Sequence, residues 1–144
     1  MLRIKNYKFY NTQIDDLIIP DGDIVNVTGV AGAGKTTFLN WIYNMLTGQE
    51  IIPNGCIVSK YSFDEIMFFN GIADDDITLD THASMFAGQK VLLFEIEECP
   101  VANLVKILSW ISYFSGLKNK PTIIFSTQGV KIDYPGIKVV KLCQ

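Results

Sequence analysis

The chain has 144 residues and contains one arginine, Arg3, and one histidine, His82. Nucleotide kinases and ATPases with an arginine finger stabilise the transferring phosphate with arginine side chains, whose planar fork matches phosphate oxygens. The near absence of arginine therefore argues against a phosphate clamp supplied by this chain alone. His82 lies where a short polar stretch turns apolar, so we expect a surface or helix-capping role for it.

Long apolar runs are absent as well. A membrane-spanning helix needs roughly 18 or more consecutive apolar residues. The segments Val91–Phe94 and Ile123–Phe125 have only the length of buried strands. The N-terminal segment Met1–Lys5 alternates polar and apolar residues and lacks the apolar core and cleavage site of a signal peptide. We therefore expect no transmembrane segment and a cytoplasmic location.

Cysteines are few and charge is not clustered. Cys56, Cys99 and Cys143 are widely separated, and neither their number nor their spacing suggests a disulfide framework or a metal cluster. The net charge is −3 and the lysines are scattered, so a nucleic-acid surface is not indicated. A content of 49% hydrophobic and 19% charged residues is typical of a globular chain, and we expect residues 1–144 to form a single domain.

Hydrophobic periodicity and turn residues predict strands alternating with helices. The predicted strands cover residues 2–9, 12–19, 23–28, 56–59, 65–69, 90–96, 121–127 and 137–142, and the predicted helices cover residues 36–46, 81–87 and 100–114. This order predicts an α/β fold. Its central sheet is expected to be mostly parallel and flanked by helices, with an antiparallel β portion at the N-terminus.

A glycine-rich loop connects the predicted strand over 23–28 to the predicted helix over 36–46. Glycines allow successive backbone N–H groups to converge on phosphates, and the N-terminus of the following helix adds a favourable dipole. Lys35 supplies a charge for the β- and γ-phosphates, and the Thr36 hydroxyl can coordinate Mg²⁺. The sequence therefore predicts binding of ATP with Mg²⁺ through Gly29, Val30, Ala31, Gly32, Ala33, Gly34, Lys35, Thr36 and Thr37.

Acidic residues follow the buried strand over 90–96, at the end where ligands bind in open α/β sheets. We assign Glu97 to the Mg²⁺ site and Glu98 to the general base that polarises an attacking water. Glu95 is the competing candidate for the metal, because it directly follows four apolar residues. The alternative is a solvated acidic strand end without chemistry. The next strand ends in Ser126-Thr127-Gln128, polar groups that could contact a γ-phosphate.

With these residues in place, the sequence resembles the nucleotide-binding domain of ABC-type ATPases nearly from end to end. This resemblance implies that the α/β fold is of the P-loop NTPase class. Arg3–Tyr10 is similar to the opening strand of that family, which ends in an aromatic residue that stacks on adenine, here Tyr10. Gly29–Thr37 matches the Walker A segment, and Phe94–Pro100 resembles the acidic pair with its proline. Ile123–Gln128 resembles the strand that ends in the switch histidine, with glutamine in its place. The resemblance implies catalytic roles for Glu97, Glu98 and Gln128.

Three departures from the family pattern lie between Lys35 and Glu98. The first is that this interval is too short for a full helical subdomain. That subdomain is expected to be missing or reduced to residues 70–90. Met85–Gln89 is only weakly similar to the signature that completes the site of a partner across a dimer, and a short helix ended by Gly88 is the alternative. Asn70 stands roughly where the family has a bridging glutamine.

These observations favour a minimal ABC-class ATPase that hydrolyses ATP slowly, with the nucleotide controlling association with a second copy or with a protein partner. The alternative is a binding module that holds ATP as a structural or signalling ligand without turnover, which the glutamine at 128 and the lack of arginine favour. A small-molecule kinase would need a lid and phosphate-clamping arginines.

Overall fold

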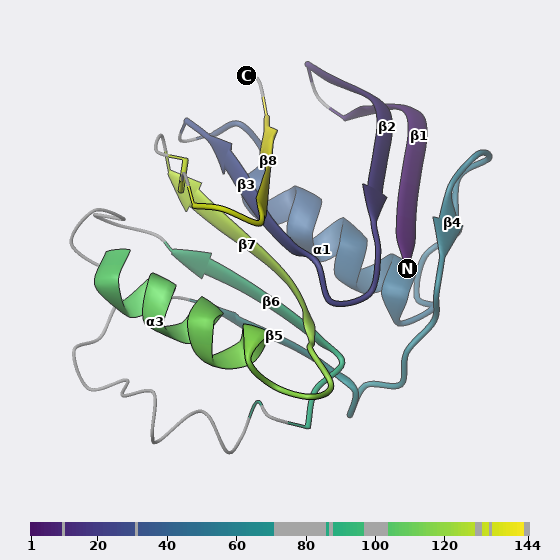
Figure 1. The fold of residues 1–144 in the computed structure, drawn as a ribbon. Coiled ribbons are helices and arrows are strands. Elements are labelled where there is room, and N and C mark those ends of the chain that lie inside the picture. Colours follow the sequence, from purple (N-terminus) through teal and green to yellow (C-terminus); the bar gives the residue numbers. More distant parts are fainter. Residues whose placement is uncertain are drawn as a thin grey trace.

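The structure, a computed structural model, describes residues 1–9, 11–30, 32–70, 86, 88–96, 104–128, 131–132 and 134–142. Figure 1 shows two sheets and the helices packed against them. The strands are β1 (Leu2–Phe9), β2 (Thr12–Ile19), β3 (Ile24–Gly29), β4 (Ile57–Val58), β5 (Ile66–Asn70), β6 (Val91–Ile96), β7 (Thr122–Gln128) and β8 (Ile137–Lys141), and the helices are α1 (Lys35–Leu46) and α3 (Leu104–Ser115).

The larger sheet has five strands in the order β5-β6-β7-β3-β8, and every neighbouring pair is parallel. Each strand was predicted to within one or two residues, because apolar runs bounded by turn residues mark buried strands. The prediction of a mostly parallel sheet is therefore confirmed. All carboxyl ends meet at one edge, which is where β3 leads into α1 (Figure 1).

The smaller sheet is antiparallel, in the order β2-β1-β4. Strand β1 pairs with β2 from Leu2↔Ile19 to Phe9↔Thr12, which confirms the predicted antiparallel portion at the N-terminus. Strand β4 is shorter than the predicted 56–59 and pairs only through Leu2↔Val58 and Arg3↔Ile57.

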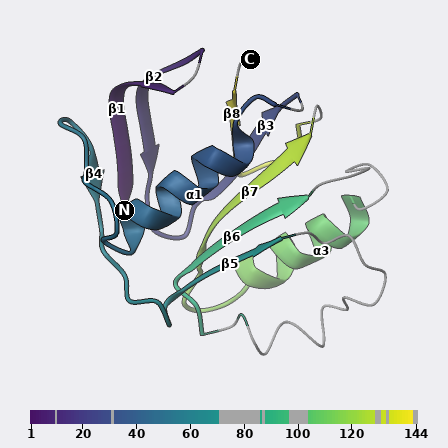
Figure 2. The same ribbon diagram turned by 180° about the vertical axis from the view of Figure 1, so that it is seen from behind.

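Two hydrophobic cores lie on the two faces of the parallel sheet. The first joins α1 and the antiparallel sheet to one face, and its fully buried members include Phe38, Leu39, Ile42 and Met45. Val91 and Leu93 of β6 point into this core, whereas Leu92, Phe94 and Ile96 point to the opposite face, since side chains alternate along a strand. Figure 2 shows the ribbon from behind, with α1 nearer the viewer than α3.

The second core lies between α3 and the opposite face. Trp110 and Phe114 of α3 pack there with Phe94 and Phe125, whose rings are stacked with centroids 5.2 Å apart. The helix predicted over 100–114 begins at Leu104 in the described part of the chain, because residues 97–103 lie outside it. Of the helix predicted over 81–87, only Phe86 is described. Neither of the two described helices could cross a membrane.

Candidate functional site

The glycine loop leaves β3 at Gly29 and enters α1 at Lys35. Gly32 and Gly34 have φ angles of 83° and 95°, a left-handed conformation that L side chains rarely adopt. The Ala33 N–H donates to the Val30 carbonyl at 3.1 Å, which closes a turn in the loop. Both glycines are therefore required by the backbone conformation of the loop.

Gly29 is required for a different reason. A Cβ atom at this position would lie 3.0 Å from the Ala33 Cβ and 3.0 Å from the Leu142 carbonyl oxygen. The Leu142 N–H in turn donates to the Thr28 carbonyl at 2.8 Å, so the chain after β8 is held against the base of the loop. Close packing with a segment more than 100 residues away therefore requires a glycine at this position.

The N-terminus of α1 is open toward the loop. The helix has no side-chain cap at Gly34 and no acidic residue in its first turn, although the Phe38 N–H donates to the Gly34 carbonyl at 2.8 Å. Thr36 and Thr37 of the first turn are exposed. Uncapped N–H groups and the helix dipole at such an end favour an anion.

Lys35 bends back over the loop. Its Nζ donates to the carbonyls of Gly29 at 2.9 Å and Val30 at 2.8 Å. Partial burial lowers the pKa of Lys35 below its usual value, and the negative charge of Glu95 opposes that shift. The ammonium group therefore lies at the mouth of the loop, where a phosphate could replace the two carbonyls as its partner.

Glu95 is the penultimate residue of β6 and lies on the face that carries α1, because it continues the alternation of Val91 and Leu93. Its side chain is 6% exposed, and its Oε1 is buried with no hydrogen-bond partner among the residues that the structure describes. In register, Glu95 stands between Asn70 of β5 and Ser126 of β7. A buried carboxylate oxygen without a partner is costly unless a cation, a donor or a water satisfies it.

The predicted segment Ser126-Thr127-Gln128 divides between the two faces of the sheet. The Thr127 Oγ1 accepts a hydrogen bond from Asn26 Nδ2 at 3.1 Å, on the face away from α1. Ser126 is buried on the α1 face beside Glu95 in register, and Gln128 is exposed and paired in register with Gly29. Of the three residues, Gln128 is thus the one accessible at the loop.

Asn26 has a structural role that the sequence reasoning missed. It is fully buried in β3, its Nδ2 also lies 3.4 Å from the Phe125 carbonyl, and its Oδ1 accepts from the Ile132 N–H at 2.8 Å. The side chain therefore fastens the segment that follows β7 to the centre of the sheet. The sequence did carry a signal for this role, because Asn26 is the one polar residue within the apolar segment Ile24–Val27. A buried polar side chain needs hydrogen-bond partners.

Several predicted site residues lie outside the described part of the chain, namely Tyr10, Ala31, Glu97 and Glu98. A neighbouring aromatic is described: the Tyr7 ring stacks on Trp41 of α1, with centroids 4.5 Å apart and planes 9° from parallel. In the weak signature match, Phe86 is buried with its ring centroid 5.6 Å from that of Trp110. Phe86 therefore belongs to the second core, whereas Met85 and Ala87 of the same match lie outside the described residues.

The fold is shared with a solved structure. A chain of a structure described as a metal-chelate type ABC transporter in an inward-facing conformation matches with a TM-score of 0.53 and 17% sequence identity, over 88% of this chain and 72% of that chain. No protein-family model matches this chain. No curated protein matches it either. At this identity the likeness concerns the fold alone, a mixed α/β fold that in this chain has a five-stranded parallel sheet and a smaller antiparallel sheet.

Proposed function

We propose that the chain binds ATP with Mg²⁺ through the loop of residues 29–37. One observation carries this proposal: the loop joins a central parallel strand to an uncapped helix N-terminus, and Lys35 lies over its mouth near the buried carboxylate of Glu95. Backbone N–H groups at such an end stabilise phosphate charge, and ligands of open α/β sheets bind at the carboxyl ends of the strands.

The residues present fit a magnesium ion. Mg²⁺ prefers oxygen ligands, and it is commonly held by a hydroxyl, one or two carboxylates, waters and the phosphates themselves. Thr36 offers an exposed hydroxyl, and Glu95 offers a buried oxygen that lacks a partner among the described side chains and backbone groups. We therefore prefer Glu95 to Glu97 for the carboxylate of this site. The bound ion would neutralise charge that develops on the phosphates.

Slow hydrolysis in the manner of ABC-type ATPases is the function that we propose for the bound nucleotide. Glu98 remains the predicted general base, and Gln128 lies exposed beside Gly29, where its amide can hydrogen-bond to a γ-phosphate or a water. The nucleotide would control association with a second copy or a protein partner. ATP held without turnover is the second candidate, because Gln128 cannot titrate and Arg3, the sole arginine, is paired with Asp16.

Binding and turnover are tested by separate measurements on the wild type, Lys35→Ala, Glu98→Gln and the matched control Lys118→Ala. Calorimetry should show ATP binding that Lys35→Ala weakens and Lys118→Ala leaves unchanged, since Lys118 is in an exposed turn after α3. Phosphate release should be lost in Glu98→Gln while binding persists. Tight ATP binding by a wild type that releases no phosphate would select the non-hydrolysing module, and absence of ATP binding would refute the proposal.

Light scattering with and without ATP tests the association. Glu98→Gln should form a larger species with ATP than without it, because a nucleotide that is bound but not hydrolysed holds the associated state. An unchanged mass at saturating ATP, alone and with candidate partner proteins, would remove association from the proposal and leave nucleotide binding intact.

A further inference from the structure

Leu142 follows β8 and anchors the end of that strand against the base of the glycine loop. The residues of β8 itself are exposed or half-buried, whereas Leu142 is 1% exposed and belongs to the core on the face that carries α1. Strand β8 is the last strand in the order of the parallel sheet, and its pairing with β3 runs to Thr28↔Lys141. Leu142 therefore lies where β3 passes into the loop.

Two kinds of contact join Leu142 to the loop. A Cβ atom at Gly29 would lie 3.0 Å from the carbonyl oxygen and 3.6 Å from the Cβ of Leu142, and also 3.0 Å from the Ala33 Cβ. Gly29 is thus enclosed between Ala33 and Leu142, which belong to the same core. The Leu142 N–H donates to the Thr28 carbonyl at 2.8 Å, so a backbone hydrogen bond holds the two segments together at this point.

Ala33 stands between Gly32 and Gly34, the two loop glycines with positive φ angles. Glycine has no side chain that restricts its backbone, so contacts from elsewhere must keep such a loop in a single conformation. The Ala33 side chain is 1% exposed, and its N–H donates to the Val30 carbonyl at 3.1 Å. Packing of this buried methyl group at the base of the loop therefore restrains the turn that leads to the N-terminus of α1.

We propose that Leu142 is a positioning residue for nucleotide binding, which holds the glycine loop in its phosphate-binding conformation before the nucleotide arrives. This role rests on the proposed function of the loop. The Leu142 side chain is buried in the core and acts through Gly29 and Ala33. A loop that is ordered beforehand loses less conformational entropy on binding, so ATP binds more tightly. By linkage, bound ATP should in turn stabilise the packing of Leu142.

Calorimetry with ATP and Mg²⁺ on variants of Leu142 tests this role. If Leu142→Ala leaves the loop in its binding conformation about one tenth of the time, ATP should bind about tenfold more weakly. Leu142→Met keeps the volume of the side chain and should bind nearly as the wild type does. Leu142→Val removes less of the side chain and should give a smaller loss in the same direction, so the test does not depend on the folding of Leu142→Ala.

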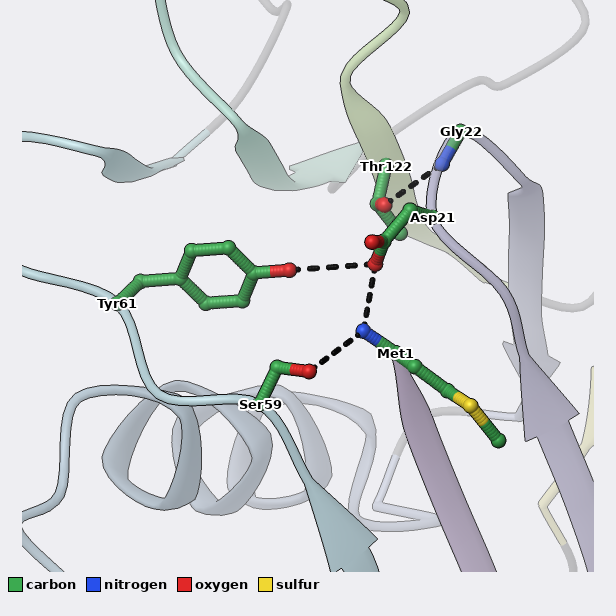
Figure 3. Close-up of polar contacts among 6 residues, drawn as sticks. All are labelled: Met1, Asp21, Gly22, Ser59, Tyr61 and Thr122. Atoms are coloured by element: carbon green, nitrogen blue, oxygen red, sulfur yellow. Dashed lines mark hydrogen bonds and ion pairs between the residues drawn. The ribbon is translucent and has the colours of Figure 1, made fainter.

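Thr122→Val is the matched control at the opposite edge of the sheet. Figure 3 shows the Gly22 N–H donating to Thr122 Oγ1 at 3.0 Å, at the amino end of β7. Loss of this bond should lower the free energy of unfolding and leave ATP affinity unchanged, because the glycine loop lies at the carboxyl ends of the strands. The same edge keeps the bond from the Met1 ammonium group to the Asp21 carboxylate, so the variant should fold.

Amide hydrogen exchange without nucleotide separates positioning of the loop from a general loss of stability. In Leu142→Ala, the Ala33 N–H should exchange faster by a larger factor than the amides of α3, whereas in Thr122→Val the two factors should be equal. Unchanged ATP affinity in Leu142→Ala, or an equal loss of affinity in Thr122→Val, would overturn the role of Leu142 and leave nucleotide binding intact. A wild type that binds no ATP would instead refute the proposed function, and this role with it.

Discussion

The buried carboxylate of Glu95 and the ammonium group of Lys35 influence one another across the carboxyl edge of the parallel sheet. Burial lowers the pKa of Lys35, and the charge of Glu95 partly restores it. Glu95 reaches this position because it lies near the carboxyl end of β6 on the face that carries α1, whereas Lys35 is the first residue of α1. The two charges therefore border the space in which a phosphate and its cation are proposed to bind.

Glu95→Gln should reduce the dependence of ATP affinity on Mg²⁺. If Glu95 holds the ion directly or through a water, removal of its charge should lower ATP affinity in Mg²⁺ by roughly tenfold or more and leave affinity in EDTA nearly unchanged. The pKa of Lys35 should also fall further, since the charge that raises it is gone. Calorimetry in the two buffers and NMR titration of the lysine side chain measure these effects.

Glu50→Gln is the matched control for that change, because Glu50 is an exposed carboxylate after α1. It should alter neither the Mg²⁺ dependence nor the titration of Lys35. Equal Mg²⁺ dependence in Glu95→Gln and the wild type would return the metal assignment to Glu97.

Gly29→Ala should destabilise the protein by about 1–3 kcal/mol, the usual cost of forcing an added methyl group into a packed site. The new Cβ would press on Ala33 and on the backbone carbonyl of Leu142, and backbone cannot move aside as a flexible side chain can. Chemical denaturation measures the loss. Gly88→Ala is the control, because its Cβ would enter open space, and a similar loss in both variants would show that packing is not the cause.

Glu65 should titrate with a pKa of about 2, well below its ordinary 4.5. Lys90 is the main cause, and hydrogen bonds from the Ser62 N–H at 3.0 Å and hydroxyl at 2.8 Å add to it. Because the folded pKa is depressed, the stabilising contribution of this carboxylate is present above pH 4.5 and is lost as the pH falls toward about 2.

Carboxyl ¹³C NMR of the wild type and of Lys90→Met tests this assignment. Lys90→Met should raise the pKa of Glu65 toward its ordinary value, whereas Lys60→Met, which removes an exposed lysine elsewhere, should not. A pKa for Glu65 that is the same in Lys90→Met and the wild type would refute the ion pair as the main cause.

Asn26→Ala should lower the free energy of unfolding by about 2–3 kcal/mol, because the Ile132 N–H loses its acceptor inside the protein. The segment that follows β7 should then loosen, which amide hydrogen exchange of Ile132 would report. Asn40→Ala is the control on the exposed surface of α1, where alanine favours the helix. Exchange at Ile132 as slow as in the wild type would contradict the proposed role of Asn26.

Much of the fold could be predicted because its signals are local. The alternation or continuity of apolar residues marked the described strands, and the spacing of Phe38, Leu39 and Ile42 marked α1. The start of the predicted helix over 100–114 and most of that over 81–87 lie outside the described residues. In the candidate site, the glycines and Lys35 could be recognised because they form one contiguous motif. The carboxylate for the metal site could not be chosen among Glu95, Glu97 and Glu98 from their order along the chain.

By itself, then, the sequence determined the helices and strands and the glycine loop with Lys35, and it led us to expect a bound nucleotide. Only the tertiary structure decided that β8 pairs with the outer side of β3, that Leu142 packs on Gly29, and that Glu95 faces α1. The physical reason is that periodicity fixes which residues share a face, but strand order and packing between distant segments decide what each face meets.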